Sequence, residues 1–325
     1  MKIILGTPVR TEPKPWLYFE VESIMVNAME ADERARAITG FEGELWVDSG
    51  GYQVLKRGLE VSPYALAERY RRIGCDVCLS LDVPPAPSDD PATAQRKFET
   101  SYRNWRILRS ELPEARIMPV IHVYPDERLF ARWLSAYEDA EELAIGGAVP
   151  YVLIARGAPS NSRELAMRLF AMARERFGGR LHLLGMGSPS VSATLEILGI
   201  DSADSATWRL KAAYGKVVLP GGGERHVTSR DVNFGRRKAR EEELEELYAY
   251  LRSSGFPLLD GYDDFKSRLR ASFEYRALVN AWVILRSRSP PRSAVFKKLY
   301  LWALEWAHGP KAREEAEQSQ AQRKG

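Results

Sequence analysis

Three aspartates at the ends of short apolar runs are the residues of this sequence best suited to chemistry. Asp48 follows the apolar residues 45–47 and precedes a serine and two glycines. Asp82 closes a second apolar run, and Asp204 lies in a third. Paired carboxylates can serve as general acid, general base or nucleophile, notably at the anomeric carbon of a sugar. An isolated Asp-Ser-Gly-Gly segment is equally a turn whose carboxylate binds backbone amides, so the surrounding elements must decide.

Apolar segments alternate with helical patterns over the first two thirds of the chain. We expect strands at residues 2–6, 23–28, 44–51, 77–83, 116–122, 142–147, 181–187 and 201–206. The clearest helices are expected at residues 63–73, 91–111, 126–137, 162–177 and 190–198, because Pro, Ser, Asp or Asn stands near most of their starts. This alternation indicates a parallel sheet with crossover helices, and eight strands predict an α/β fold of the closed (β/α)8 TIM-barrel type.

A barrel of this kind would bring the strand ends together on one rim, where such folds keep their active sites. His122 closes the fifth expected strand, and glycine pairs lie at the ends of the sixth and seventh. Barrel closure by itself requires neither a carboxylate nor an imidazole at these positions. The convergence therefore favours a catalytic interpretation of the three aspartates.

The remainder of the chain has a different character. Residues 217–230 predict a hairpin or a lid, and the sequence that follows is helical in pattern. We expect a barrel domain over residues 1–235, a helical basic extension over 236–308 and a disordered polar tail over 309–325. No internal repeat is present.

Positive charge is concentrated in the expected helical extension. Between residues 265 and 300, nine Lys or Arg residues stand against the single acid Glu274, and Tyr275, Trp282, Phe296 and Tyr300 are interleaved with them. Such a surplus is typical of a surface that contacts phosphates. A solvated helix face is the alternative, since apolar residues recur there at helical spacing. The candidate nucleic-acid contacts are Arg286, Arg288, Arg292, Lys297 and Lys298.

Composition limits the remaining possibilities. The 325 residues are 45% hydrophobic with a net charge of +3, which indicates a globular protein with a full core. No apolar run is long enough to span a bilayer, so we expect a cytoplasmic protein. Cys75 and Cys78 are the only cysteines, too few for a disulfide framework or a four-thiolate zinc site. Strand alternation would place them on opposite faces as buried structural thiols.

Five segments of the chain resemble one known family. "VDSGGYQV", "CDVCLSLDVPPAP", "LAIGG", "LLGMGSP" and "GIDSADSATW" occur in the order, and at roughly the spacing, of the tRNA-guanine transglycosylase superfamily. The resemblance covers about residues 20 to 235. It implies a barrel enzyme that removes a guanine from its sugar in nucleic acid and installs a 7-deazaguanine without breaking the strand.

The resemblance also implies roles for individual residues. Asp204 is similar to the nucleophile that attacks C1′, and Asp48 to the general acid and base that serves the departing and incoming bases. Asp82 is similar to the carboxylate that binds the Watson–Crick edge of guanine, a pairing that adenine cannot satisfy. Tyr52 would stack on the base. The other residues assigned to the base pocket are His122, Gly146, Gly147, Gly50, Gly51 and Met186.

Two departures from the family pattern bear on the substrate. The zinc-binding Cys, Cys, Cys and His set that usually follows the nucleophile motif is missing, because no cysteine occurs after Cys78. We therefore expect neither a metal nor another cofactor. Where the tRNA enzymes commonly show Gln-Gly-Gly, this chain has His122-Val123-Tyr124, and His122 can either donate to a base carbonyl or serve a structural role.

The zinc-less pattern is more similar to the branch that inserts 7-deazaguanines into DNA. The expected partners are therefore DNA, or alternatively tRNA, together with a 7-deazaguanine base such as preQ0. Two further hypotheses remain. A non-catalytic barrel that binds nucleic acid would have no chemical need for both Asp48 and Asp204. A glycosidase for a small sugar would need only paired acids, and would not need the basic, aromatic-rich C-terminal stretch.

Overall fold

The computed structural model describes residues 1–51, 61–152, 161–228 and 237–322, with side chains up to residue 318. Its main sheet is parallel and has the strand order β5-β4-β3-β2-β1-β9-β8-β7-β6. The strands are β1 (Lys2–Gly6), β2 (Ser23–Asn27), β3 (Glu44–Asp48), β4 (Val77–Leu79), β5 (Ile117–Met118), β6 (Val120–His122), β7 (Glu142–Gly146), β8 (Arg180–Leu183) and β9 (Ser202–Ser205). All eight expected strand segments are present in this sheet.

The barrel closes at Pro119, which divides one expected strand into β5 and β6. Proline has no backbone N–H to give to a ladder, but the carbonyls on this segment still accept hydrogen bonds from both sides. Ser80 donates its N–H to Met118 O at 2.8 Å, and Ala144 donates to Pro119 O at 2.9 Å. Because β5 pairs with β4 and β6 pairs with β7, this one segment joins the two ends of the sheet. The predicted (β/α)8 TIM-type barrel is confirmed.

Alternate residues of the strands fill the barrel interior with apolar side chains. Ile4, Met25, Trp46, Leu79 and Val120 belong to one buried cluster inside the sheet. Side chains of a strand alternate between its two faces, so the residue two positions beyond Trp46 also faces inward, one layer closer to the carboxyl end. That residue is Asp48.

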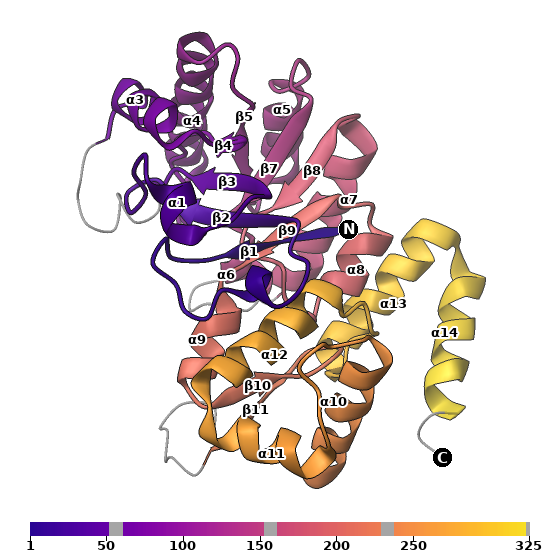
Figure 1. Cartoon of the computed structure of the whole chain (residues 1–325). Coiled ribbons are helices and arrows are strands. Elements are labelled where there is room, and N and C mark those ends of the chain that lie inside the picture. Colours follow the sequence, from indigo (N-terminus) through magenta and orange to yellow (C-terminus); the bar gives the residue numbers. More distant parts are fainter. Residues whose placement is uncertain (52–60, 153–160, 229–236, 323–325) are drawn as a thin grey trace.

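Helices cover the outer face of the sheet (Figure 1). Ser62, Asp90 and Asp126 each cap a following helix by accepting backbone N–H bonds of its first turn, as their residue types favour. The predicted helices 63–73 and 91–111 have the expected bounds. The helices around the barrel are α1 (Ala35–Thr39), α3 (Pro63–Ile73), α4 (Pro91–Glu111), α5 (Glu127–Ser135), α6 (Ala148–Val152), α7 (Ser162–Arg176), α8 (Ser192–Ile197) and α9 (Thr207–Ala213), with the 3₁₀ turn η1 (Pro15–Leu17).

The chain after α9 forms the expected hairpin and then helices (Figure 1). Asn280, fully buried on α12, ties these parts together. It accepts from Val218 N and donates to the carbonyls of Trp208 and Lys216. The elements are the antiparallel strands β10 (Lys216–Val218) and β11 (Glu224–His226), then α10 (Glu241–Ser253), α11 (Tyr262–Ala271), α12 (Phe273–Arg286), α13 (Ala294–His308) and α14 (Pro310–Gln322).

The polar tail differs from its prediction. Instead of disorder, Pro310–Gln322 forms helix α14, which packs against α13. Its sequence is rich in Ala, Glu, Gln, Lys and Arg, which are strong helix formers, and Pro310 stands at the first helical position. Arg313 also binds Glu305 of α13 and Glu317 of its own helix.

The prediction for the cysteines is wrong. Cys75 and Cys78 form a disulfide, with their Cα atoms 5.9 Å apart. The expectation of opposite faces assumed a strand that includes both residues, but β4 begins only at Val77. Gly74 ends α3 in the left-handed conformation, and the turn after it brings Cys75 back toward Cys78.

Within the part of the chain described here, no helix has the length and apolar character needed to cross a membrane.

Candidate active site

The three aspartates singled out in the sequence lie at the carboxyl ends of the barrel strands. Asp48 ends β3, Asp204 lies in β9, and Asp82 follows β4 by three residues. The carboxylates of Asp82 and Asp204 lie close enough to Asp48 that their charges raise its pKa. The predicted convergence on one rim is therefore present in the structure.

Asp48 is the most perturbed of the three carboxyl groups. Burial, followed by the charges of Asp82 and Asp204, raises its pKa to about 7, and backbone N–H groups of Gly50 and Ser49 offset this only in part. Its register partner on β2 is Asn27, whose side-chain amide donates to Asp48 Oδ2 at 3.4 Å. Both protonation states of Asp48 are thus populated at neutral pH, as general acid–base catalysis requires.

Asp82 is held from both sides by polar neighbours. Its Oδ2 lies 2.8 Å from His122 Nε2, and its Oδ1 accepts from Ser49 Oγ at 3.2 Å. A carboxylate can only accept, so His122 carries its proton on Nε2. The Asp82 carboxylate lies close to the backbone of Gly51, which has no side chain; a Cβ there would lie 2.7 Å from Asp82 Oδ1. Asp82 is thereby fixed with lone pairs that remain available to a ligand.

Asp204 accepts two hydrogen bonds on the same oxygen. Gly185 donates its backbone N–H to Oδ1 at 2.7 Å, and His182 Nε2 lies 3.3 Å from that atom. Gly185 has a φ of +71°, a conformation that favours glycine and here aims the N–H at the carboxylate. His182 was not among the sequence candidates. Its ring contacts Trp46 of the interior cluster, and a histidine within the expected strand 181–187, three residues before Gly185, is the signal that could have identified it.

The remaining candidates for the base pocket are placed as follows. Gly146 is the register partner of His122 at the end of β7, and Gly147 follows it. Gly50 lies beside the Asn27 side chain. Met186 is buried and packs in the hydrophobic core. Tyr52 lies outside the described residues.

The arginines proposed to contact nucleic acid have partners inside the protein. Arg286 lies over the Trp282 ring at 3.7 Å from its centroid and donates to Glu20 O, and Arg288 donates to Met1 O at 2.8 Å. Arg292 binds Pro220 O and Glu246. These guanidinium groups are partly buried, and their hydrogen bonds mainly connect distant segments of the fold.

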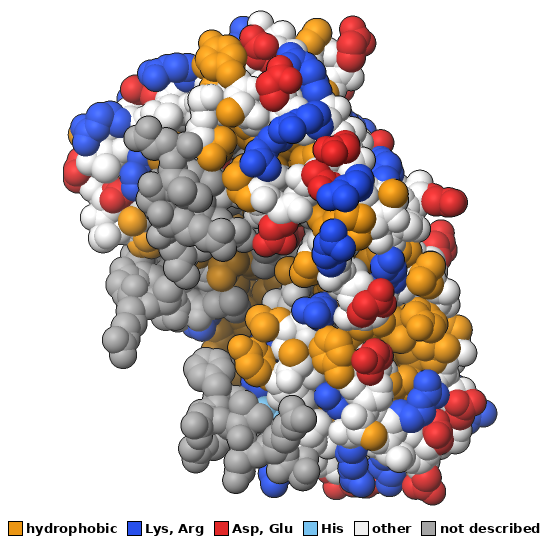
Figure 2. All heavy atoms as spheres, turned by 60° about the vertical axis from the view of Figure 1, so that its left-hand side comes forward, with side chains coloured by type: hydrophobic (Ala, Val, Ile, Leu, Met, Phe, Trp, Pro, Cys, Tyr) orange, Lys and Arg blue, Asp and Glu red, His pale blue; other side chains and the backbone are white. Residues whose placement is uncertain are grey.

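The two candidate lysines lie on α13. Lys298 is largely exposed and pairs with Glu164 at 2.8 Å, and Lys297 is half-buried. Figure 2 shows one face of the molecule, on which Lys and Arg side chains are interspersed with Asp and Glu. The uneven charge of the sequence therefore does not translate into a patch of one sign on that face.

The zinc site of the resembled family does not fit this chain. The two cysteines, one just before β4 and one within it, are joined to each other, and no cysteine follows them in the sequence. Across residues 1–51, 61–152, 161–228 and 237–322, no group of three or more His, Cys, Asp or Glu side chains is arranged to hold a metal ion.

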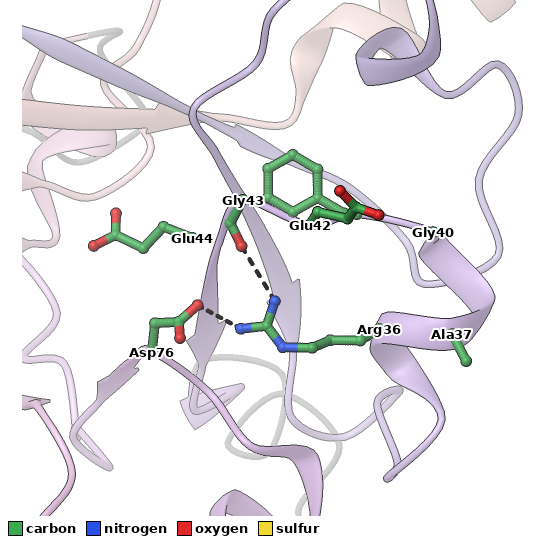
Figure 3. A pocket seen from close by; sticks show the side chains of 8 residues that line it. Arg36, Ala37, Gly40, Glu42, Gly43, Glu44 and Asp76 are labelled. Carbon is green, nitrogen blue, oxygen red and sulfur yellow. Dashed lines mark hydrogen bonds and ion pairs between the residues drawn. The ribbon is translucent and has the colours of Figure 1, made fainter.

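A pocket of about 1040 Å³ lies beside α1, and Figure 3 shows the residues that line it. It is lined by Glu44, at the amino end of β3, and by Asp76, just before β4. Arg36 reaches across it to Asp76 and to the carbonyl of Gly43. Because it opens at the amino ends of the strands, this cavity is separate from the carboxylate rim.

Comparison with known proteins gives several relatives, although no family model matches. A tRNA-guanine(15) transglycosylase of Aeropyrum pernix is 30% identical over 203 residues, 58% of this chain and 37% of its own length. The enzyme of the same name from Pyrococcus abyssi is 28% identical over 191 residues, 58% of this chain and 32% of its own. Uncharacterized protein 306 of Sulfolobus islandicus rod-shaped virus 1 is 27% identical over 267 residues, 80% of this chain and 75% of its length. The chain thus spans about a third of the length of the transglycosylases it matches.

Proposed function

We propose, from the similarity of this chain to the tRNA-guanine transglycosylase superfamily, that it exchanges a guanine in nucleic acid for a 7-deazaguanine. The observation that carries the proposal is the convergence of three carboxylates on the rim, where burial and the charges of Asp82 and Asp204 raise the pKa of Asp48 to about 7. Base exchange by double displacement needs a nucleophile, a proton carrier and a group that recognises the base. Asp204, Asp48 and Asp82 have the chemistry for these three roles.

The reaction would proceed in two displacements at C1′. The carboxylate of Asp204 attacks C1′ as the bond to the guanine nitrogen breaks, and the Asp48 carboxyl gives its proton to the departing base. Asp48, now a carboxylate, then takes the N9 proton of the incoming 7-deazaguanine. That nitrogen attacks C1′ and releases Asp204. Two inversions retain the configuration of the sugar.

Base selection would rest on Asp82. A guanine edge presents N1–H and N2–H side by side, and one carboxylate can accept both. The His122 and Ser49 contacts fix the Asp82 plane before the base arrives, which reduces the entropy lost on binding. The amides of Gly146 and Gly147, at the neighbouring strand end, would meet the O6 of the base.

Two observations favour different polymers. The curated relatives are named as tRNA-guanine(15) transglycosylases, which favours tRNA. This chain has no cysteine after Cys78. In this respect it is more similar to the branch that modifies DNA, which favours DNA. In either case the target base must leave its stack to reach the rim.

The test is base exchange with both polymers. Purified protein would be incubated with a labelled 7-deazaguanine such as preQ0 and either unmodified tRNA or guanine-containing DNA, and nucleosides would be analysed by mass spectrometry. We expect label in one polymer, a covalent adduct at Asp204, and no exchange by Asp204→Asn. That variant should still bind the polymer, because it keeps the shape of the site. Absence of label from both polymers, or full exchange by Asp204→Asn, would contradict the proposal.

A further inference from the structure

His182 lies inside the barrel, directly behind the carboxylate of Asp204. It is the register partner of Ser202, two residues before Asp204 on β9, and its side chain is 1% exposed. Neither the acid–base step nor the base-recognition step of the proposed reaction uses it. A fully buried imidazole in contact with a proposed nucleophile requires an explanation.

The orientation of the His182 ring is fixed by its surroundings. Nδ1 lies 2.9 Å from Ser202 Oγ, and the ring centroid lies 4.9 Å from that of Trp46. The other ring nitrogen, Nε2, lies 3.3 Å from Asp204 Oδ1. Because a carboxylate only accepts, the contact with Asp204 requires a proton on His182 Nε2. The Ser202 hydroxyl, which can donate or accept, satisfies Nδ1 and holds the ring in the orientation that directs Nε2 toward Asp204.

The two hydrogen bonds that described residues make to the Asp204 carboxylate both end on Oδ1. One comes from the Gly185 backbone N–H at 2.7 Å and the other from His182 Nε2. The torsion about the bond between Cβ and Cγ is broad, so a carboxylate without partners can turn its plane. Two donors from different directions, one in a loop and one in β8, hold one oxygen in place and thereby fix the plane and the position of the other oxygen.

From this geometry we propose that His182 is a positioning residue that selects Oδ2 of Asp204 as the attacking oxygen. The inference rests on the proposed function, in which Asp204 is the nucleophile. Oδ2 forms the bond to C1′ while the bond from C1′ to the base breaks, and the departing base takes its proton from Asp48. Oδ1 becomes the carbonyl oxygen of the ester and continues to accept from Gly185 and His182, so neither donor has to move during the reaction.

The expected effect of His182 is on the chemical step. A carboxylate that is free to rotate spends part of its time outside the attack geometry, and misplacement by about 1 Å costs on the order of 100-fold in rate. The polymer and the free base do not contact His182, because Asp204 and Trp46 lie around it. Loss of its donor should therefore slow formation of the adduct without weakening binding.

Two substitutions separate the donor from the space that the ring fills. In His182→Gln the side-chain amide can place an N–H near the position of Nε2, whereas in His182→Asn it reaches only the position of Nδ1. We expect His182→Asn to slow adduct formation about 10- to 100-fold, with an unchanged dissociation constant for the polymer, and His182→Gln to recover most of that loss. Ser202→Ala, which removes the hydrogen bond that orients the ring at Nδ1, should give an intermediate rate.

The measurement is the single-turnover rate of adduct formation with saturating polymer, next to a binding titration. Equal rates for His182→Asn and wild type, or equal losses for the Asn and Gln variants, would overturn the positioning role. If both His182 variants fail to fold, Ser202→Ala decides, since an unchanged rate would overturn the inference as well. Peptide mass spectrometry of the wild-type adduct keeps the two proposals apart. If no adduct forms at Asp204 the proposed function fails, whereas an adduct there with an unaffected variant rate refutes only the role of His182.

Discussion

The imidazole of His122 and the carboxylate of Asp82 are joined at 2.8 Å between Nε2 and Oδ2, although 40 residues separate them in the sequence. His122 ends β6 and Asp82 follows β4, so the pair spans the strand junction at Pro119 where the barrel closes. Closure of the barrel and orientation of the proposed base-reading carboxylate therefore depend on the same few residues.

This pair leads to a prediction about base binding. Asp82→Ala should weaken binding of free guanine or 7-deazaguanine by about 2–4 kcal/mol, because a charge-assisted pair of hydrogen bonds is lost. His122→Leu should have a smaller effect, since the carboxylate remains but is no longer held in place. Isothermal titration with the free base measures both. An unchanged constant for Asp82→Ala would mean that another residue reads the base.

The raised pKa of Asp48 makes a prediction about stability. With a folded-state pKa of about 7 and an unfolded value near 3.9, the folded protein binds the extra proton between these pH values. Stability is therefore lost as pH rises through this window. The side chain introduced by Asp48→Asn cannot ionise, so the variant does not lose this stability. The difference in free energy of unfolding between the variant and wild type should therefore shift in favour of the variant by up to about 4 kcal/mol between pH 4 and pH 8.

Urea denaturation of both proteins at several pH values checks this expectation. The adjacent amide of Asn27 should tolerate the substitution, because the side-chain amide introduced by Asp48→Asn has the same shape as the carboxylate it replaces. Curves of stability against pH that stay parallel for the two proteins would show that Asp48 has an ordinary pKa in the fold.

The basic residues after β11 should divide into two groups. Arg286, Arg288 and Arg292 donate to backbone carbonyls of distant segments, so replacing all three with Ala should lower the free energy of unfolding by about 3 kcal/mol or more. Their loss should change the salt dependence of nucleic-acid affinity little. Replacing Lys297 and Lys298 with Ala should instead leave stability nearly unchanged and reduce that salt slope by about two units.

Affinity for DNA or tRNA at several salt concentrations, together with urea denaturation, separates the two groups. A flattened slope for the arginine variant in its folded range would show that these side chains reach phosphates in addition to their internal partners. A slope unaffected by the lysine pair would remove α13 from the proposed nucleic-acid contact.

We also expect activity without stoichiometric zinc. Cys75 and Cys78 are joined to each other and lie before β4 and within it, remote in the chain from the segment after Asp204 where the resembled family holds its metal. Elemental analysis of pure protein should give well under one zinc per chain, and treatment with a chelator should leave both base exchange and thermal unfolding unchanged. About one zinc per chain, with unfolding on its removal, would contradict this expectation.

Local patterns in the sequence were sufficient to predict the barrel and its acidic rim. Short apolar runs alternating with capped amphipathic helices specify strands and helices within a few residues, since period and capping are properties of neighbouring residues. The position of Asp48, directly after the apolar residues 45–47, placed it at a strand end. The same local reasoning failed for Cys75, because the start of β4 is set by pairing with β3 and β5 rather than by alternation alone.

Only the tertiary structure decided how the rim residues act on one another. The pKa of Asp48 depends on its burial in the fold and on two carboxylates, one 34 residues and the other 156 residues away in the chain. His182 acquires its contact with Asp204 only because β8 and β9 pair in a register that aligns it with Ser202. In the sequence, the arginines at and beyond the end of α12 suggest a free basic surface. In the structure they instead donate to the carbonyls of residues 1, 20 and 220, which the fold brings close to them. Each of these properties depends on distances between residues far apart in sequence, and such distances are fixed only when the barrel closes.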